Sequence, residues 1–192
     1  MNAKNNIIII SGPAGSGKDS VISALSKQCT LERVVTSSTR AMRIGESEGH
    51  PYYFISREKF EAMIKSGAFF EYSINENNEY YGVTQEELNR VMQSGKLGVW
   101  KMEWKGVISV KKLLPFIKAI FIIAPLEILE LRLRQRDGGF HDEQYFAERM
   151  EYTREWFKHS DIYDFTVINK EGKLNETVTD VTNYIRQQGL LP

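Results

Sequence analysis

A glycine-rich run with one lysine is the clearest chemical signal in this sequence. Gly12, Gly17 and Lys18 fit the spacing G-x-x-x-x-G-K within the segment GPAGSGKDS. Such glycines leave successive backbone N–H groups free to converge on a phosphate, and the lysine adds a mobile charge for the outer phosphates. The spacing therefore predicts a loop that binds the triphosphate of a nucleotide.

Asp19 occupies the position at which this pattern has serine or threonine, and Ser20 follows it. The hydroxyl at that position binds magnesium. A carboxylate beside phosphates is repelled by them unless a cation lies between, so two interpretations stay open. Asp19 either binds Mg²⁺, directly or through water, or turns outward as an acidic residue in the first turn of a helix.

The elements around the loop are those that a phosphate-binding loop requires. Four isoleucines at 7–10 predict a buried strand before the loop, and a helix is expected over about 18–28 after it. The positive end of that helix dipole would face the phosphates. A glycine-rich turn without a ligand is the structural alternative, but strand, loop, lysine and helix in this order favour the binding loop.

Length and composition set further bounds. The 192 residues are 42% hydrophobic and 26% charged, which predicts one globular domain. Lys plus Arg and Asp plus Glu both count 25, so no broad basic field favours nucleic acid or a membrane as partner. The single cysteine, Cys29, excludes an internal disulfide, and no secretory signal or twenty-residue apolar span is found. We therefore expect a cytoplasmic protein that binds small molecules, of unknown oligomeric state.

Strand and helix patterns alternate along the rest of the chain. Strands are expected at 33–38, 52–54, 69–73, 80–84, 98–102, 117–124 and 163–169, and helices at 84–92, 107–114 and 177–188 and from 56 and 125. Ser56 is expected to cap the first of these helices, and the apolar run at 117–124 to be a central strand. Strands separated by helices throughout predict a doubly wound parallel α/β sheet.

A polar run between 36 and 54 offers a second anion site. Arg40 and Arg43 lie three residues apart among hydroxyl side chains, and two guanidinium groups could hold a smaller phosphate bidentately. A phenol from the strand that follows, such as Tyr52, could face the same anion. Solvated surface arginines are the structural alternative.

Glu71 lies among aromatic residues in the first arm of an expected hairpin. A carboxylate there can accept two hydrogen bonds from a planar N–H and NH₂ pair, and guanine presents that pair on its Watson–Crick edge. Tyr80, Tyr81 and Gly82 in the second arm could close the same pocket. A solvated edge charge and simple cross-strand aromatic packing are the alternatives.

A loose segment, DGGFHDEQ, separates two helices that carry arginines. Its adjacent glycines, Gly138 and Gly139, favour a mobile lid. Arg132 and Arg136 before the segment and Arg149 after it could reach a transferring phosphoryl group. Ion pairs along a solvated helical face are the alternative.

Together these pieces resemble the guanylate kinase family. The segments GPAGSGKDS, STRAMRIGESEGHPYYF, FFEYS, YYGVT, FIIAP with RLRQR, and DFTVIN occur in the family order between about Ile7 and Asn169. The resemblance implies a P-loop NTPase fold, with helices on both faces of a parallel sheet, a small mixed α/β excursion that binds the monophosphate, and a lid. It implies one domain, with a core at about 1–36 and 96–192, the excursion at about 37–95 and the lid at about 137–148. The implied reaction transfers the γ-phosphoryl group of MgATP to GMP.

The resemblance also implies roles for individual residues. The residues acting on the transferring group would be Lys18, Arg136 and Arg149. ATP and its Mg²⁺ would contact Gly12, Ala14, Gly15, Ser16, Gly17, Lys18, Asp19, Ser20 and Asn169, with Asp19 as the candidate metal ligand. GMP would contact Thr36, Arg40, Arg43, Tyr52, Glu71, Tyr81, Thr84 and Glu103. Their work would be positioning and charge neutralisation, without a general base.

Three features depart from the family pattern. Val83 stands where the family usually offers Ser or Thr to guanine, so Thr84 would have to replace that contact. Lys101 stands where the family usually has an acid, while Glu103 keeps the second acid. This change reverses the charge beside the phosphates unless Lys101 points away. The DGGFHDEQ segment is also longer than the family lid.

Two other functions stay open. The segments GKDS and YYGV also resemble ribose 1,5-bisphosphate phosphokinase, which phosphorylates a sugar phosphate. Glu71 and the GE-x-x-G-x-x-Y spacing from Gly45 to Tyr52 argue against that acceptor. Scaffold relatives of the family imply an inactive module that binds a phosphorylated peptide in the monophosphate groove. The intact Gly17-Lys18 loop argues against this second alternative.

Overall fold

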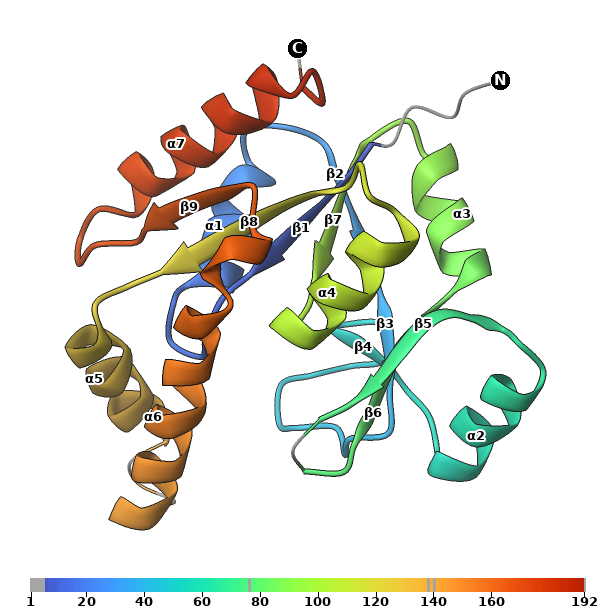
Figure 1. Cartoon of the computed structure of the whole chain (residues 1–192), viewed down its shortest axis with the longest axis horizontal. Helices are drawn as coiled ribbons and strands as arrows, with labels where there is room; N and C mark the ends of the chain where they lie inside the picture. The colour runs from blue at the N-terminus through green and yellow to red at the C-terminus, as the bar shows by residue number, and fades with distance from the viewer. Residues whose placement is uncertain (1–5, 76, 138, 140, 192) are drawn as a thin grey trace.

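The isoleucine strand lies at the centre of a five-stranded parallel sheet with the order β2-β7-β1-β8-β9 (Figure 1). The structure, a computed structural model, describes residues 6–75, 77–137, 139 and 141–191. The strands of this sheet are β1 (Ile7–Ser11), β2 (Leu31–Val34), β7 (Leu97–Lys101), β8 (Lys118–Ile123) and β9 (Phe165–Ile168). Because parallel strands all end at one edge of the sheet, the loops that follow them gather there.

Helices cover both faces of this sheet. On one face, Ile8 and Ile10 pack with α1 (Lys18–Leu25) and α7 (Leu174–Gln187). On the other face, Ile7 and Ile9 pack with α3 (Gln85–Gln93) and α4 (Trp104–Leu113). Since successive side chains of a strand point to opposite faces, a strand covered on both sides needs an apolar residue at every position. The predicted doubly wound α/β sheet is confirmed.

Ser11 ends β1 with two polar contacts. Its Oγ donates a 2.7 Å hydrogen bond to the Met102 carbonyl oxygen and lies 3.0 Å from Tyr163 Oη. The backbone of Ser11 pairs with Phe121 of β8. The strand is therefore held at the point where it turns into the glycine-rich loop.

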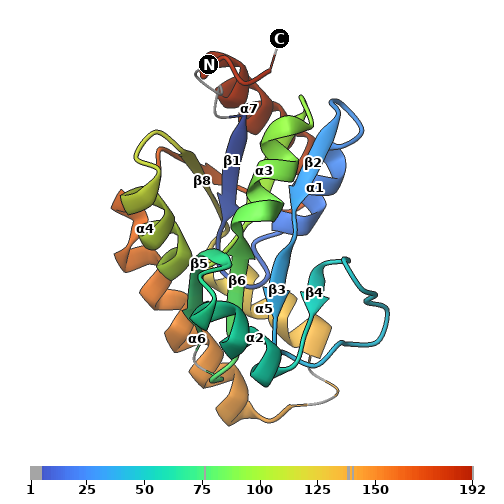
Figure 2. The same ribbon diagram turned by 90° about the vertical axis from the view of Figure 1, so that its right-hand side faces the viewer.

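A second sheet, with the order β4-β3-β6-β5, lies beyond the carboxyl ends of β2 and β7 (Figures 1 and 2). It consists of β3 (Thr36–Ser38), β4 (Tyr52–Phe54), β5 (Phe69–Ile74) and β6 (Tyr80–Thr84), and α2 (Arg57–Lys65) lies between β4 and β5 in the chain. Strands β5 and β6 form the predicted antiparallel hairpin. The Ser56 hydroxyl caps α2, as predicted, by accepting from the Lys59 N–H at 3.2 Å.

Two details of the predicted strands are wrong. The expected strand at 33–38 is divided between the two sheets, as β2 and β3, with Val35 between them. The strand expected at the centre, 117–124, is β8, which lies between β1 and β9, and β1 holds the centre instead. Apolar content indicates that a strand is interior, but the order of the strands depends on how the chain crosses over between them.

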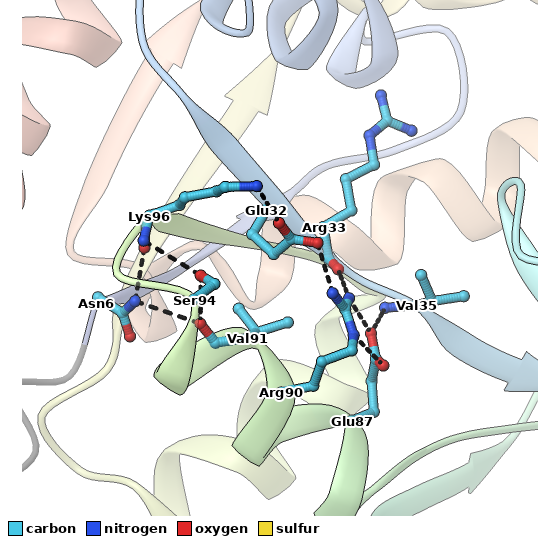
Figure 3. Close-up of polar contacts among 9 residues, drawn as sticks. All are labelled: Asn6, Glu32, Arg33, Val35, Glu87, Arg90, Val91, Ser94 and Lys96. Carbon is cyan, nitrogen blue, oxygen red and sulfur yellow. Dashed lines mark hydrogen bonds and ion pairs between the residues drawn. The ribbon is translucent and has the colours of Figure 1, made fainter.

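Glu87 of α3 binds the chain where it passes from one sheet to the other (Figure 3). Its Oε1 accepts a 2.7 Å hydrogen bond from the Val35 N–H. Arg90 donates to both oxygens of Glu87 at 2.9 Å, to Glu32 at 2.5 Å and to the Arg33 carbonyl oxygen at 2.8 Å. Helix α3 is thus tied to β2 and to the residue that follows it.

Two long helices, α5 (Leu126–Asp137) and α6 (Glu143–Lys158), extend beyond the edge at which the strands of the five-stranded sheet end (Figure 1). They pack through Leu133, Phe146 and Met150, and the 3₁₀ turn η1 (Ser160–Ile162) follows α6. The predicted lid at 137–148 includes residues 138 and 140, so its hinge candidate Gly138 lies outside the described residues. None of the described helices combines the length and the apolar run needed to cross a lipid bilayer.

Candidate active site

One cleft of about 790 Å³ runs from the glycine-rich loop to the second sheet. The loop after β1, the end of β7, the β5–β6 hairpin and helix α6 all contribute to its wall. Its volume lies within the range of pockets that enclose small molecules, roughly 300–1,000 Å³. The cleft therefore has room for a ligand at each end, one on the loop and one on the second sheet.

The glycines of the loop are required by close approach and by backbone conformation. A Cβ atom on Gly12 would lie 2.1 Å from the Ile122 carbonyl oxygen. Gly17 has a φ of 88°, and a Cβ atom there would lie 2.2 Å from Asn169 Nδ2. Both contacts are far shorter than van der Waals distance, so neither position accepts a side chain without displacement of its neighbours.

Hydrogen-bonding groups that could bind a ligand lie at two places in the loop, the start of α1 and Ser16. Within the described chain no side chain caps the start of α1 after Gly17, so the first-turn N–H groups remain for a ligand. The Ser16 hydroxyl is fully buried and has no hydrogen-bond partner among the described residues. A buried polar group without a partner is costly unless a ligand satisfies it. These groups fit a phosphate.

Lys18 lies across the loop. Its Nζ donates to the Gly12 carbonyl oxygen at 2.6 Å and to the Pro13 carbonyl oxygen at 2.8 Å. Burial, and next the positive charge of Lys101, lower the pKa of Lys18 to about 8. An anion at the loop would bind the Lys18 ammonium group more strongly than the two carbonyl groups do, because it carries a full negative charge and they are neutral.

Asn169 and Arg132 support the loop from behind. Asn169 Nδ2 donates to the Ser16 carbonyl oxygen at 2.9 Å, and its Oδ1 accepts from Thr177 Oγ1 at 3.3 Å. The guanidinium group of Arg132 donates to the Gly15 carbonyl oxygen at 3.1 Å. Arg132, considered above for the transferring group, thus binds the backbone of the loop in this structure.

Asp19 and Lys101 form an ion pair at the mouth of the loop. Lys101 Nζ lies 2.8 Å from Asp19 Oδ1. Partial burial in the cleft raises the pKa of Asp19. The charge and hydrogen bond of Lys101 outweigh this effect and hold the pKa below its ordinary value. Lys101 therefore points into the site, and the charge reversal noted in the sequence is real.

The donor set fits a magnesium ion that arrives with a nucleotide. Among the described residues no cluster of three acidic, histidine or cysteine side chains could hold a metal without other ligands. The Asp19 carboxylate is 68% exposed beside the loop, with a second oxygen in addition to the one that binds Lys101. Mg²⁺ is commonly bound through one or two carboxylates together with phosphate oxygens and water, which this single carboxylate allows.

Glu71 lies at the other end of the cleft. Its side chain is only 9% exposed, and Oε2 has no hydrogen-bond partner within the described chain. Burial raises the pKa of Glu71 to about 7. The pairing of β5 with β6 shifts between Phe69 and Glu71, and such bulges redirect side chains near binding sites. A buried carboxylate that lacks a partner is a binding group for a ligand that donates hydrogen bonds.

Most of the other predicted acceptor residues also line the cleft. They are Thr36, Arg43, Tyr52, Tyr81 and Glu103. They come from β3, the β3–β4 connection, β4, β6 and the residue that precedes α4. The fold thus brings together residues that are up to 67 positions apart in the sequence, the separation of Thr36 and Glu103.

Two predicted acceptor residues are not among the described residues that line the cleft. Arg40 donates to the two Glu46 oxygens at 2.8 and 3.0 Å, and its guanidinium carbon lies 5.3 Å from the centre of the Tyr52 ring. The Thr84 hydroxyl caps α3 by accepting from the Glu87 N–H at 3.1 Å. That hydroxyl accepts one hydrogen bond in the helix cap, and a contact of Thr84 with the base in place of Val83 stays a prediction.

The arginines of α5 and α6 reach the cleft from the side opposite the second sheet. Arg136 and Arg149 both line it. In this structure Arg136 donates to both oxygens of Asp137 at 2.7 Å. To bind a phosphoryl group, Arg136 would have to give up these hydrogen bonds to Asp137.

Sequence reasoning missed several residues of the cleft wall. Ser73 lines it two positions after Glu71, and the alternation of side chains along β5 could have identified it. Tyr152 donates to Glu103 at 2.9 Å and lies one turn beyond Arg149 on α6, so helical spacing pointed to it. Asn75, in the hairpin turn, gave no such signal.

The fold and the site define a class of enzyme. A glycine-rich loop with the phosphate-binding pattern follows the central strand of a parallel sheet, and one cleft joins it to a second region that has its own sheet. This arrangement is that of a P-loop phosphotransferase with a small-molecule acceptor.

Comparisons with known proteins name the family within this class. A sequence profile described as guanylate kinase matches residues 4–188. The guanylate kinase of Haemophilus influenzae is 35% identical over 191 residues, which cover 98% of this chain and 90% of that protein. That of Buchnera aphidicola subsp. Acyrthosiphon pisum is 36% identical over 182 residues, covering 92% and 86%. The crystal structure of guanylate kinase from Anaplasma phagocytophilum shares the fold, with a TM-score of 0.73 at 24% identity over 95% of this chain and 85% of that one. The chain belongs to the guanylate kinase family.

Proposed function

We propose that this protein transfers the γ-phosphoryl group of ATP to GMP, giving ADP and GDP, with Mg²⁺ bound to the nucleotide. The observation that carries the proposal is the buried, unpartnered carboxylate of Glu71 at the acceptor end of a cleft whose other end is the phosphate-binding loop. Membership of the guanylate kinase family supports the same reaction.

Glu71 selects guanine. Its ionised carboxylate accepts hydrogen bonds from the N–H and NH₂ groups on the Watson–Crick edge of the base. Adenine does not present this donor pair, so AMP would leave the buried carboxylate unpaired. A site built around such a polar contact rejects analogues that lack it by large factors, because the unsatisfied group bears its full desolvation cost. Thr36 lines the cleft nearby and completes the acceptor site.

The acceptor phosphate is held by Tyr52, Tyr81 and Arg43, which line the same cleft as Glu71 and the loop. Arg40 joins them by exchanging Glu46 for the phosphate, since the two anions compete for the same guanidinium group. Glu103 contributes from the end of β7. These residues fix the acceptor oxygen in line with the phosphoryl group.

The donor phosphates bind on the backbone N–H groups of Gly12 and of residues 14–20, and the adenine lies toward Asn169. Lys18 leaves the carbonyl groups of the loop to contact the outer phosphates. Arg136 and Arg149 neutralise the charge that spreads over the transferring group. This work is electrostatic and positional, so the site needs no general base.

Asp19 is the residue that would hold Mg²⁺. The ion supplies positive charge to the phosphate oxygens during the transfer. Closure of the described parts of the lid and of the excursion over both substrates excludes water from the reaction. We propose the cytoplasm as the compartment in which this reaction takes place.

The two alternatives are not favoured. A sugar bisphosphate has no donor pair for Glu71 and would leave the carboxylate buried without a partner. A phosphopeptide module would have no use for the phosphate-binding loop, for a helix start without a side-chain cap or for the buried Ser16 hydroxyl.

The test is a coupled ADP-release assay with MgATP on GMP, dGMP, IMP, AMP and ribose 1,5-bisphosphate. Fast turnover is expected on GMP and dGMP, with IMP weakened because it lacks the NH₂ group, and AMP slower than GMP by about 10³-fold or more. The variant Glu71→Gln should lose most GMP turnover, since its amide accepts only one of the two hydrogen bonds. Turnover on the sugar bisphosphate alone, or on no acceptor, would contradict the proposal.

A further inference from the structure

Asp19, which departs from the phosphate-loop pattern, contacts Lys101, which departs from the family pattern. Asp19 is in the first turn of α1, Lys101 is the last residue of β7, and their charged groups lie 2.8 Å apart. The phosphate-loop pattern has a hydroxyl residue at the first position, and the family pattern has an acid at the second. This chain therefore has a carboxylate on α1 in addition to Glu103, and an ammonium group at the end of β7.

The sheet places that ammonium group beside the loop. Lys101 pairs with Ile10 of β1, two residues before the loop begins at Gly12. Lys101 and Lys18 both line the cleft. The two ammonium groups therefore belong to the same cleft wall.

Stability does not account for this arrangement. The Asp19 side chain is 68% exposed and that of Lys101 is 24% exposed. An exposed ion pair adds little to the free energy of unfolding, whereas two lysines at one site repel each other. Concentrated positive charge beside an uncapped helix start instead favours a bound anion.

We propose that Lys101 is a second phosphate-binding lysine of the donor site, which contacts the γ-phosphoryl group of ATP and is positioned by Asp19. This inference rests on the proposed function. Nζ of Lys101 has three N–H donors, so it binds a phosphate oxygen while one N–H stays on Asp19. The second Asp19 oxygen remains for magnesium. The tethered cation adds positive charge to the site that does not depend on the concentration of free Mg²⁺.

The test measures ATP, ADP and GMP affinity by calorimetry in EDTA, where no metal contributes. Lys101→Met is expected to weaken ATP binding about tenfold and ADP binding less than about twofold, because only ATP has the γ-phosphoryl group. Lys101→Arg should keep most of the ATP affinity. Lys158→Met is the matched control, because Lys158 also pairs with a carboxylate, Glu155, but on the exposed face of α6. This control should bind ATP as the unchanged protein does.

The same experiment separates the possible failures. Unchanged GMP affinity shows that Lys101→Met is folded, so unchanged ATP affinity in that variant would overturn the inference. Equal losses for ATP and ADP would overturn the assignment to the γ-phosphoryl group. In an Asp19→Ser background the effect of Lys101→Met should fall below about threefold if Asp19 positions the lysine, and an undiminished effect would refute that role. Absence of ATP binding to the unchanged protein would instead contradict the proposed function.

Discussion

Glu87 of α3 accepts a 2.7 Å hydrogen bond from the backbone N–H of Val35, the residue that separates β2 from β3. Glu87 is only 6% exposed, and Arg90 holds both of its oxygens (Figure 3). The junction of the two sheets is therefore held by two neighbouring side chains of α3. Since the acceptor residues lie beyond this junction, its geometry sets where the second sheet stands relative to the loop.

Removal of the Glu87 carboxylate should destabilise the protein. Glu87→Ala leaves the Val35 N–H without its acceptor and is expected to lower the free energy of unfolding by about 2 kcal/mol. Glu87→Gln keeps an acceptor oxygen and should cost about half as much. Urea unfolding measures both. Glu155→Ala removes an exposed acid and should stay within about 0.5 kcal/mol, so equal effects of Glu87→Ala and Glu155→Ala would contradict this role.

The buried acid of the acceptor site predicts a pH dependence of stability. Burial raises the pKa of Glu71 to about 7 in the folded protein, from 4.5. The folded state thus favours the protonated form, so the contribution of Glu71 to stability is complete below pH 4.5 and is lost as the pH rises to about 7. Relative to Glu71→Gln, the unchanged protein should lose about 2–3 kcal/mol across this window. Urea unfolding of both proteins between pH 5 and 8 measures the difference, and parallel curves would refute it.

Lys18 should be required for turnover but unfavourable for stability. Its pKa of about 8 lies below the ordinary 10.5, so the folded state disfavours its charged form. The corresponding loss of stability is absent above pH 10.5 and is complete once the pH falls below about 8. Lys18→Met should therefore abolish turnover and, at pH 7, raise the free energy of unfolding by about 1–2 kcal/mol, after allowance for the two hydrogen bonds to the loop. A variant that is inactive and also less stable at pH 7 would contradict this account.

Gly17 offers a comparison between two glycines of similar backbone conformation. Gly17 has a φ of 88° and Gly95 a φ of 70°, but only at Gly17 does a described neighbour, Asn169 Nδ2, occupy the place of a Cβ atom. Gly95→Ala should cost about 1 kcal/mol in stability from backbone strain and leave ATP affinity unchanged. Gly17→Ala should also displace Asn169 from the Ser16 carbonyl oxygen and weaken ATP binding by more than about tenfold. Calorimetry measures the affinity, and equal ATP affinity in the two variants would count against this packing argument.

The features that could be predicted from the sequence are those that depend on a few consecutive residues. Gly12, Gly17 and Lys18 lie within seven residues, so their spacing alone predicts the loop. The cap at Ser56 and the hairpin that carries Glu71 follow from short patterns of the same kind. The two covered faces of the sheet followed from four successive isoleucines.

The features that could not be predicted depend on partners far away in the chain. The run at 33–38 has no break in its strand pattern, and it is divided because Val34 pairs with Trp100 whereas Ser37 pairs with Gly82. Asp19 and Lys101 were each unusual, but their contact depends on the register of β1 and β7. The ion pair between Arg40 and Glu46 is likewise visible only in three dimensions.

The hydrogen bonds of Ser11 have a consequence for how the central strand finds its place. Ordinarily a strand displaced by one residue exposes apolar side chains and buries polar ones, and this penalty enforces correct alignment. In β1 the four residues before Ser11 are identical, and both faces are covered, so such a displacement would bury almost the same surface. The isoleucines therefore hold β1 in the sheet but do not set its register. Ser11, through Met102 and Tyr163, sets the register of β1 and so fixes the point at which the glycine-rich loop begins.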